Sequence, residues 1–342
     1  MKEKVEKILA DVFTRHSDRR LDVYKVQVES AGADEIKLTG RVLMPEALEE
    51  TRGALCDVFP GVSINLSGVR VLRAAPGAIW TVASTLTDLH VEPSFLSEMY
   101  LQIPNGSPLE ILDEHTDGKW CYVRMPDGYM GWAYKLYLEE GSAGSEPTHI
   151  VFSSSTLVCR EPRKEVVTRL MTGTLIRVLE EKHDWSQVET FGKTTPKGWV
   201  DSAMLRDLKS RPKKPGDIRA QIVADARHLI GTYYLWGGNT PWGIDCSGLA
   251  QLTHRLAGYM LPRDADMQFR AATPVEAPYQ AGDLFFFHSE ANKNKIAHVG
   301  ICTGGSHVIH SSRSRNGVYE EDMQASETLR NTFAGARIFV PR

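Results

Sequence analysis

Little in this 342-residue chain indicates a membrane, a nucleic acid or a metal. No apolar run is long enough to span a bilayer, and a formal net charge of −3 provides no general attraction for nucleic acid or anionic lipid. The five cysteines are odd in number and far apart, without paired metal-ligand spacing. The first helical segment lacks the continuous apolar centre of a signal peptide. We therefore expect reduced thiols, a cytoplasmic location, no metal or cofactor, and no membrane or nucleic-acid partner.

The composition is otherwise that of a globular protein, with 42% hydrophobic and 24% charged residues, and the length favours several domains. Residues 1–73 show an amphipathic helix, two alternating strands, a second helix and a third strand. This order predicts a small α+β domain that resembles the BON domains of bacterial envelope proteins. No residue in it demands chemistry, so we expect a packing or docking module.

An internal repeat follows. Residues 106–140 and 173–208 share a glycine, an alternating strand, a tryptophan, a second strand and a Gly-Trp pair. Short strands separated by turn residues predict two small β-barrels, residues 76–141 and 146–208, which resemble bacterial SH3-like domains. The Pro- and Lys-rich residues 209–216 are typical of a linker.

Residues 217–342 have a different pattern. A helix with one apolar face comes first, and apolar, β-prone segments follow, among them GDLFFFHSE, KIAHVGICT and SHVIHSS. Helices followed by a run of strands predict an α+β domain with an antiparallel sheet.

The segment WGIDCSGLA places a cysteine where a glycine-containing loop becomes a helix. Asp245 is expected to cap a helix that starts near Cys246, while Gly243 and Gly248 allow close packing. At that end of a helix the free N–H groups favour a thiolate and can hold an oxyanion. The placement is typical of a nucleophile, although an unpaired cysteine can also be a small buried hydrophobe.

A thiol nucleophile needs a base, and the C-terminal strands supply histidines. A hairpin with Gly305 in the left-handed conformation would set His298 opposite His310, so that one imidazole takes the thiol proton and the other orients it. His288 and His307 are weaker candidates, because one ends its strand and the other lies at the turn. Structural histidines are the alternative interpretation.

Six segments carry a resemblance when they are taken in order: YLWGG, DCSG, RDADMQ, GDLFFF, HVGI and VIHSS. This set resembles the NlpC-type cell-wall cysteine peptidases, a papain-like family. The resemblance implies a papain-like catalytic domain over residues 217–342, with Cys246 as nucleophile, His298 as base and His310 as the orienting residue. It also implies that Tyr234 is a second oxyanion donor beside the Cys246 N–H, the alternative being a core aromatic.

Tandem SH3-like domains before such a domain resemble the γ-D-glutamyl-L-diamino-acid endopeptidases. That resemblance implies murein peptide substrates with a free N-terminal L-Ala, cut between γ-D-Glu and diaminopimelate or lysine. Glu98, Tyr129 and Asp264 are then expected to hold the ammonium group, and Ser247 and Trp236 to line the cleft. A surface carboxylate, a surface tyrosine and a turn aspartate are the alternatives.

The expected function is therefore that of a cysteine peptidase in cell-wall peptide recycling. Two other functions stay open, a wall-peptide binding protein with an idle cysteine and an acyl transferase on the same fold. Hydrolysis and acyl transfer both pass through a thioester, so the residues do not separate them. Ala265 stands where related enzymes often carry a serine, which removes one expected hydroxyl contact.

Overall fold

The computed structural model describes residues 1–141, 146–191 and 197–342. The predicted break between the two barrels, at residues 142–145, lies outside the described residues. So do residues 192–196 of the predicted second barrel. Within the described ranges no helix is both long and apolar enough to cross a membrane.

The chain forms two compact units. One consists of Met1–Trp80 with Pro108–Leu136, and the other of Thr81–Ser107 with Tyr137–Arg342. Residues of the predicted first barrel therefore occur in both units.

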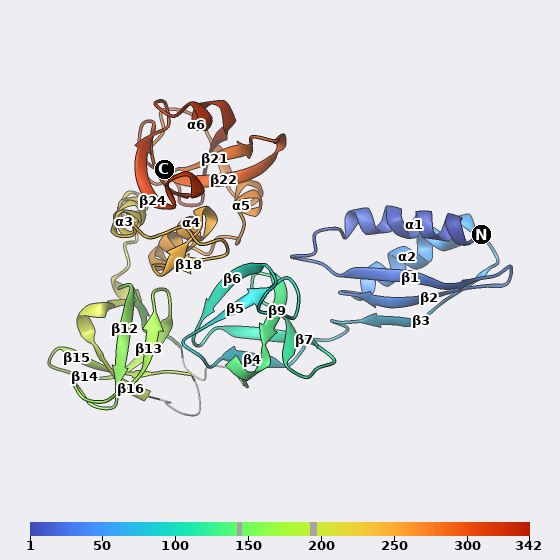
Figure 1. Ribbon diagram of the computed structural model, residues 1–342, viewed down its shortest axis with the longest axis horizontal. Helices are drawn as coiled ribbons and strands as arrows, with labels where there is room; N and C mark the ends of the chain where they lie inside the picture. Colours follow the sequence, from blue (N-terminus) through green and yellow to red (C-terminus); the bar gives the residue numbers. More distant parts are fainter. Residues whose placement is uncertain (142–145, 192–196) are drawn as a thin grey trace. The chain divides into compact units, whose positions relative to one another are not determined.

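The N-terminal elements follow the predicted order. They are α1 (Lys2–Arg15), β1 (Tyr24–Ala31), β2 (Glu35–Val42), α2 (Pro45–Val58) and β3 (Ser63–Val71). The middle strand β2 pairs antiparallel with β1 and parallel with β3. Both helices pack on this sheet through one apolar core (Figure 1). The helical period of the apolar residues is the physical reason, because it places Val5, Leu9 and Val12 of α1 on a single buried face.

Seven short strands and one 3-10 turn cover the predicted first barrel. In the second unit β5 pairs with β6, and in the first unit β8 pairs with both β7 and β9. The bounds are β4 (Ile79–Val82), β5 (Leu86–His90), β6 (Met99–Pro104), β7 (Pro108–Glu114), β8 (Trp120–Arg124), β9 (Met130–Tyr134), η1 (Lys135–Tyr137) and β10 (Leu138–Glu140). The SH3-like assignment stays a prediction.

The predicted second barrel forms a seven-stranded sheet in the order β13-β12-β16-β15-β14-β11-β17. Gly198 of the repeated Gly-Trp pair has a packing role, because a Cβ there would lie 2.4 Å from Val158 Cγ1. The bounds are β11 (His149–Val151), β12 (Ser155–Cys159), β13 (Val166–Met171), β14 (Leu175–Lys182), β15 (Trp185–Glu189), β16 (Lys197–Asp201), η2 (Ser202–Met204), β17 (Leu205–Asp207) and η3 (Leu208–Ser210). The SH3-like assignment is again a prediction.

The C-terminal region is α+β, as predicted, with helices first and a six-stranded antiparallel sheet afterwards. The sheet order is β20-β25-β21-β22-β23-β24. The elements are α3 (Pro215–His228), β18 (Asn239–Thr240), β19 (Gly243–Ile244), α4 (Cys246–Ala257), α5 (Ala265–Ala271), β20 (Thr273–Val275), β21 (Leu284–Ser289), β22 (Asn292–Gly304), β23 (His307–Ser312), η4 (Arg313–Arg315), β24 (Gly317–Asp322), α6 (Glu327–Thr332) and β25 (Phe333–Ile338).

Both faces of this sheet are covered, which explains the continuous apolar run of β21. Leu284 and Phe286 belong to the core that includes residues of α3 and α4. Phe285 and Phe287 alternate with them and belong to a second core, which includes Leu329 of α6. Side chains of a strand point to opposite faces in turn, so a strand buried on both sides is apolar throughout. One face of the sheet thus shares its core with α4, the helix that begins with Cys246.

Gly248, in the first turn of α4, provides a test of this packing. A Cβ at Gly248 would lie 2.3 Å from the Gly238 carbonyl oxygen, which is backbone and cannot move aside cheaply. Gly248→Ala is expected to lower the free energy of unfolding by about 1–3 kcal/mol, a typical cost of overpacking. Gly216→Ala in α3 is the matched control, because nothing lies within 4 Å of its Cβ position. Urea unfolding of both variants checks this, and an equal stability of the two would contradict it.

Candidate active site

Asp245 holds the start of α4, as the sequence predicts. Its Oδ1 accepts a hydrogen bond of 2.7 Å from the Gly248 amide, which caps the helix. Its Oδ2 accepts one of 3.0 Å from the Gly237 amide. One carboxylate thus ties the Gly237 loop to the first turn of the helix that begins with Cys246.

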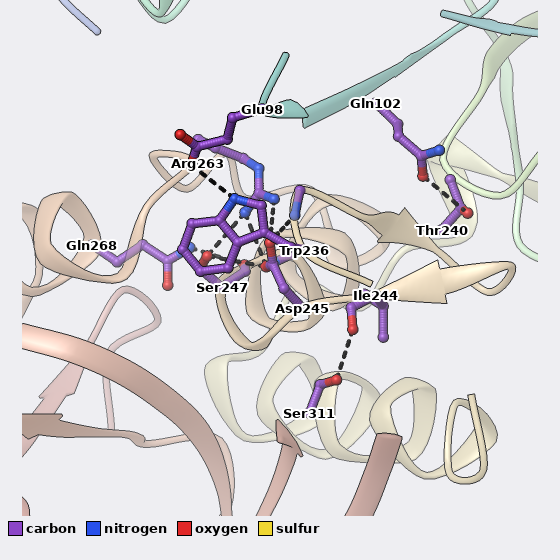
Figure 2. A network of polar contacts seen from close by, with 12 residues as sticks. Glu98, Gln102, Trp236, Thr240, Ile244, Asp245, Ser247, Arg263, Gln268 and Ser311 are labelled. Carbon is purple, nitrogen blue, oxygen red and sulfur yellow. Dashed lines mark hydrogen bonds and ion pairs between the residues drawn. The ribbon is translucent and has the colours of Figure 1, made fainter. Parts of the chain in front are cut away.

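Arg263 is the charged partner of Asp245. Its Nη1 lies 3.0 Å from Asp245 Oδ1 and its Nη2 2.5 Å from Asp245 Oδ2, a bidentate pair that is almost wholly buried. Arg263 also donates to Ser247 Oγ at 2.9 Å, and Gln268 Nε2 donates to the Ser247 carbonyl at 3.1 Å. Figure 2 shows these side chains gathered around the start of α4. The network fixes the backbone on both sides of Cys246.

Cys246 is 9% exposed. Burial is the main reason that its pKa is raised to about 12, and the neighbouring Asp245 carboxylate raises it further. Hydrogen bonds from the Val299 and Ser247 amides and the charge of Arg263 oppose the shift. The thiol is therefore protonated at rest and lies beside the backbone of the residue that follows His298. It needs a base to become a nucleophile.

His298 and His310 are joined by a hydrogen bond of 2.7 Å between His298 Nε2 and His310 Nδ1. The prediction that they lie directly opposite each other is wrong. The register pairs Ile301 with Ile309, so the two histidines are diagonal neighbours on adjacent strands. Gly305 does have the predicted left-handed conformation, with φ +61°.

Gly300 provides the room for this diagonal contact. A Cβ at Gly300 would lie 3.1 Å from His310 Cβ and 2.4 Å from Val308 Cγ2. A side chain there would press on the residues that hold the imidazole pair. Close packing against His310 and Val308 therefore explains the glycine of HVGI, two residues after His298.

Both imidazoles are neutral near pH 7. Burial lowers the pKa of His298 to about 4, although the Asp245 carboxylate acts in the opposite direction. Burial, followed by the proximity of His298 and Arg315, lowers the pKa of His310 to about 3. A neutral His298 is able to accept the thiol proton.

Two side chains near this pair were not predicted from the sequence. Glu321 Oε1 lies 2.9 Å from His310 Nε2. The guanidinium of Arg313 lies 4.9 Å from the ring centre of Trp236 and 5.5 Å from that of Tyr234. Neither residue belongs to a recognisable motif, and their positions depend on how the chain turns after β23.

Tyr234 lies near enough to Cys246 and Asp245 for their charges to affect the pKa of its hydroxyl. Burial raises the pKa of Tyr234 to about 12, and the nearby Cys246 and Asp245 raise it further, while Arg313 opposes the shift. The hydroxyl therefore keeps its proton and is available as a hydrogen-bond donor. The Cys246 amide is a second donor of the right kind, because the first N–H groups of a helix have no partner within it.

The strand β6 and the residue before it lie against the Gly237 loop. Trp236 Nε1 donates to Glu98 Oε1 at 2.9 Å, and Thr240 Oγ1 donates to Gln102 Oε1 at 3.4 Å (Figure 2). Gly237, with φ +78°, packs closely on this strand, since a Cβ there would lie 2.6 Å from the Met99 carbonyl oxygen. Glu98 is thereby placed next to the half-exposed Trp236 ring.

The other predicted binding residues are located as follows. Asp264 is the N-cap residue of α5 and is half-buried, one position after Arg263. Ser247 is 5% exposed and belongs to the Asp245 network. Tyr129 is 1% exposed and lies in the first unit, where its amide donates a hydrogen bond of 3.0 Å to Asp127 Oδ1. Their roles in substrate binding stay predictions.

A cavity of about 750 Å³ adjoins the histidine pair. His298, His310, Arg313 and Glu321 are among its lining residues, and His288 lines it too. His307 is exposed and is the first residue of β23. No group of three or more His, Cys, Asp or Glu side chains that could hold a metal ion occurs in the described part of the chain.

Residues 231–337 match the NlpC/P60 family. This part of the chain is an NlpC/P60 domain. A gamma-D-glutamyl-L-lysine dipeptidyl-peptidase of Bacillus subtilis (strain 168) is 27% identical over 231 residues, which is 64% of this chain and 74% of that protein. A protein of the same name from Bacillus cereus (strain ATCC 10987 / NRS 248) is 25% identical over 279 residues, 77% of this chain and 81% of that one.

The match with the probable endopeptidase p60 of Listeria seeligeri is higher in identity but covers a smaller share of this chain. It is 38% identical over 106 residues, 31% of this chain and 19% of that protein. Among solved structures, an NlpC/P60 family protein from Bacillus cereus ATCC 10987 has a TM-score of 0.67 at 20% identity, over 77% of this chain and 100% of that one. At that identity the likeness shows the fold.

The buried Asp245–Arg263 pair of the NlpC/P60 domain makes a testable contribution to stability. Arg263→Met should lower the free energy of unfolding by about 3–5 kcal/mol, because it leaves a buried carboxylate without its charged partner. Arg270→Met is the matched control, since Arg270 pairs with Asp266 at 2.9 Å but is 59% exposed. It should change stability by no more than about 0.5 kcal/mol. Chemical denaturation of both variants measures the difference, and similar losses would refute the assignment.

Proposed function

We propose that this protein is a cysteine peptidase that hydrolyses the γ-D-glutamyl to diamino-acid bond of murein peptides with a free N-terminal L-Ala. The observation that carries the proposal is the position of Cys246 at the start of α4, where its thiol accepts a hydrogen bond from the amide of Val299, the residue after His298, which is itself hydrogen-bonded to His310. The names of the relatives support the same bond type.

The chemistry follows from the donors and acceptors around the thiol. His298 Nδ1 takes the Cys246 proton as Sγ attacks the scissile carbonyl carbon, and the oxyanion is held by the Cys246 amide and the Tyr234 hydroxyl. His298 then gives the proton to the leaving amine, and a thioester remains. A water molecule, deprotonated by His298, attacks the thioester and restores the thiol. His310 orients His298 throughout.

The proposed recognition of the substrate depends on two charged side chains, those of Glu98 and Arg313. Glu98, held beside Trp236, supplies an acceptor for the N-terminal ammonium group, with Asp264 as its proposed companion. Arg313, which is exposed next to the rings of Trp236 and Tyr234, supplies a cation for the free α-carboxylate of the γ-linked D-Glu. A peptide with one positive and one negative group near the cleaved bond suits this pair.

A cytoplasmic role in cell-wall peptide recycling belongs to the same proposal, since a site for a free amine selects released peptides over intact murein. The alternative activity, acyl transfer, uses the same thioester. Incubation with a defined muropeptide in water, followed by mass spectrometry, separates the two, because hydrolysis yields the free acid and transfer yields a new amide. A binding protein with an idle cysteine would leave the peptide intact.

Substitution of the three central residues should give a graded result. Cys246→Ala should abolish hydrolysis and leave the fold intact, because it removes the covalent step and little volume. His298→Ala should be nearly as damaging. His310→Gln should keep more activity, since an amide oxygen can still accept from His298 Nε2. Steady-state rates on one muropeptide check the order, and equal losses at His298 and His310 would argue against the division of roles.

The ammonium site should appear as a preference for free peptides. We expect kcat/KM for L-Ala-γ-D-Glu-diaminopimelate to exceed that of its N-acetylated form by about one to two orders of magnitude, the equivalent of one charge-assisted hydrogen bond. Glu98→Gln should narrow this gap. Glu92→Gln is the matched control, because Glu92 is exposed in the loop between β5 and β6 that leads to Glu98. Equal kcat/KM values of the unaltered protein for the free and the acetylated peptide would contradict the proposed ammonium site.

A further inference from the structure

The histidine pair does not end at His310. Three adjacent strands, β22, β23 and β24, contribute one polar side chain each to a continuous chain of hydrogen bonds. His298 Nε2 lies 2.7 Å from His310 Nδ1, and His310 Nε2 lies 2.9 Å from Glu321 Oε1. We propose that Glu321 is a positioning residue, which sets the tautomers of both histidines and so leaves His298 Nδ1 as the atom that accepts the Cys246 proton. This inference rests on the proposed peptidase chemistry.

The assignment follows from what each atom is able to donate. An ionised carboxylate only accepts hydrogen bonds, so His310 Nε2 must carry the proton in its contact with Glu321. A neutral imidazole has one donor and one acceptor nitrogen, so His310 Nδ1 is then the acceptor. His298 Nε2 must therefore be the donor, and His298 Nδ1 holds the free lone pair.

The neutral state of both rings is consistent with their surroundings. His310 is 2% exposed, and its ring is faced by His298 from β22, by Tyr319 and Glu321 from β24 and by Arg315 from η4. Arg315 Nη2 lies 3.4 Å from Glu321 Oε2 and its guanidinium lies over the Tyr319 ring, so Glu321 is anchored from the far side. Burial lowers the pKa of both histidines, so neither carries a resting charge near pH 7.

Neither the His298–His310 nor the His310–Glu321 hydrogen bond joins residues that are directly paired in the sheet register. His310 is paired with Tyr319 in the β23–β24 register, whereas Val308 is paired with Glu321. Both hydrogen bonds therefore run diagonally across the sheet, and the three side chains form one line on one face. When His298 becomes charged by the thiol proton, the carboxylate at the end of this line stabilises it through His310.

Removing the carboxylate should cost activity through the base. In Glu321→Ala the His310 tautomer is no longer set, and His298 can present Nδ1–H to the thiol instead of a lone pair. We expect kcat to fall by about 10²-fold, the lower end of what a positioned base contributes, with KM little changed. Glu321→Gln keeps an acceptor oxygen and should stay within about tenfold of the unaltered protein by the same measure. Glu320→Ala is the matched control, because Glu320 is the next residue on β24 but contacts Thr303 and Arg227 instead.

A double substitution separates positioning from simple destabilisation. A glutamine at position 310 has no tautomer to set, so Glu321→Ala should cost less than about threefold in a His310→Gln background, as expected for residues that act as a unit. The same loss in both backgrounds, or no loss in the native one, would overturn the proposal.

Two further readouts keep the test decisive if Glu321→Ala is less stable. Sodium formate should restore activity to Glu321→Ala, because Glu321 lines the cavity and a small carboxylate can occupy the vacated position, whereas sodium chloride should not. The rate at which iodoacetamide alkylates Cys246 at pH 7, followed by peptide mass, should fall in Glu321→Ala and recover with formate. This readout needs no substrate, so it distinguishes failure of the Glu321 assignment from failure of the proposed function. Unchanged alkylation, or no effect of formate, would contradict the assignment.

Discussion

The buried carboxylate of Asp245 is the constraint on which the rest of the site depends. It caps α4 through Gly248, holds the loop through Gly237 and neutralises Arg263. A charge so far from water is tolerated only when every lone pair has a donor, so these partners must stay in place together. The same charge acts against catalysis, because it raises the pKa of the Cys246 thiol. Asp245 therefore fixes the position of Cys246 but makes its thiol less acidic, so the thiol needs a base to lose its proton.

The proposed base, His298, belongs to the sheet rather than to the helix. His298 is held by a line of hydrogen bonds across β22, β23 and β24, and the glycine at position 300 leaves space for the line to run diagonally. Burial keeps both the thiol and the imidazoles neutral at rest. Charge then forms only when the proton moves, and the polar groups that will stabilise it are already oriented. Preorganisation of this kind avoids the cost of reorienting solvent during the reaction.

Much of the local structure could be predicted from the sequence, because it depends on nearest neighbours. The Asp245 cap needs only a short acidic side chain before a helix, and the order of elements in residues 1–73 follows from apolar periodicity.

Cross-strand registers could not be predicted in this way. The observed register pairs Ile301 with Ile309 and has an irregularity between Cys302 and Gly304, so His310 does not face His298 directly, and the residue pattern does not predict this register. Glu321 depends on a second register, after a turn in which Asn316 adopts φ +51°. Contacts such as Trp236 with Glu98, 138 positions apart, depend on packing between elements that no local pattern encodes.

Gly237 lies between the Asp245 cap of α4, the helix that begins with Cys246, and the strand β6, which follows Glu98. Its amide donates to Asp245, whereas the place of its missing Cβ faces the Met99 carbonyl of β6, so one residue touches both the nucleophile's cap and the strand that follows Glu98. A larger residue would have to push β6 away or pull the loop off Asp245, since the obstructing atom is backbone. Its positive φ adds a second reason for glycine. The proposed substrate selection by Glu98 and the proposed bond cleavage by Cys246 are thus mechanically coupled, because displacement of β6 would move the loop that Asp245 holds. In the proposed function, the separation between Glu98 as ammonium acceptor and Cys246 as nucleophile determines which bond of a peptide is presented to the thiol.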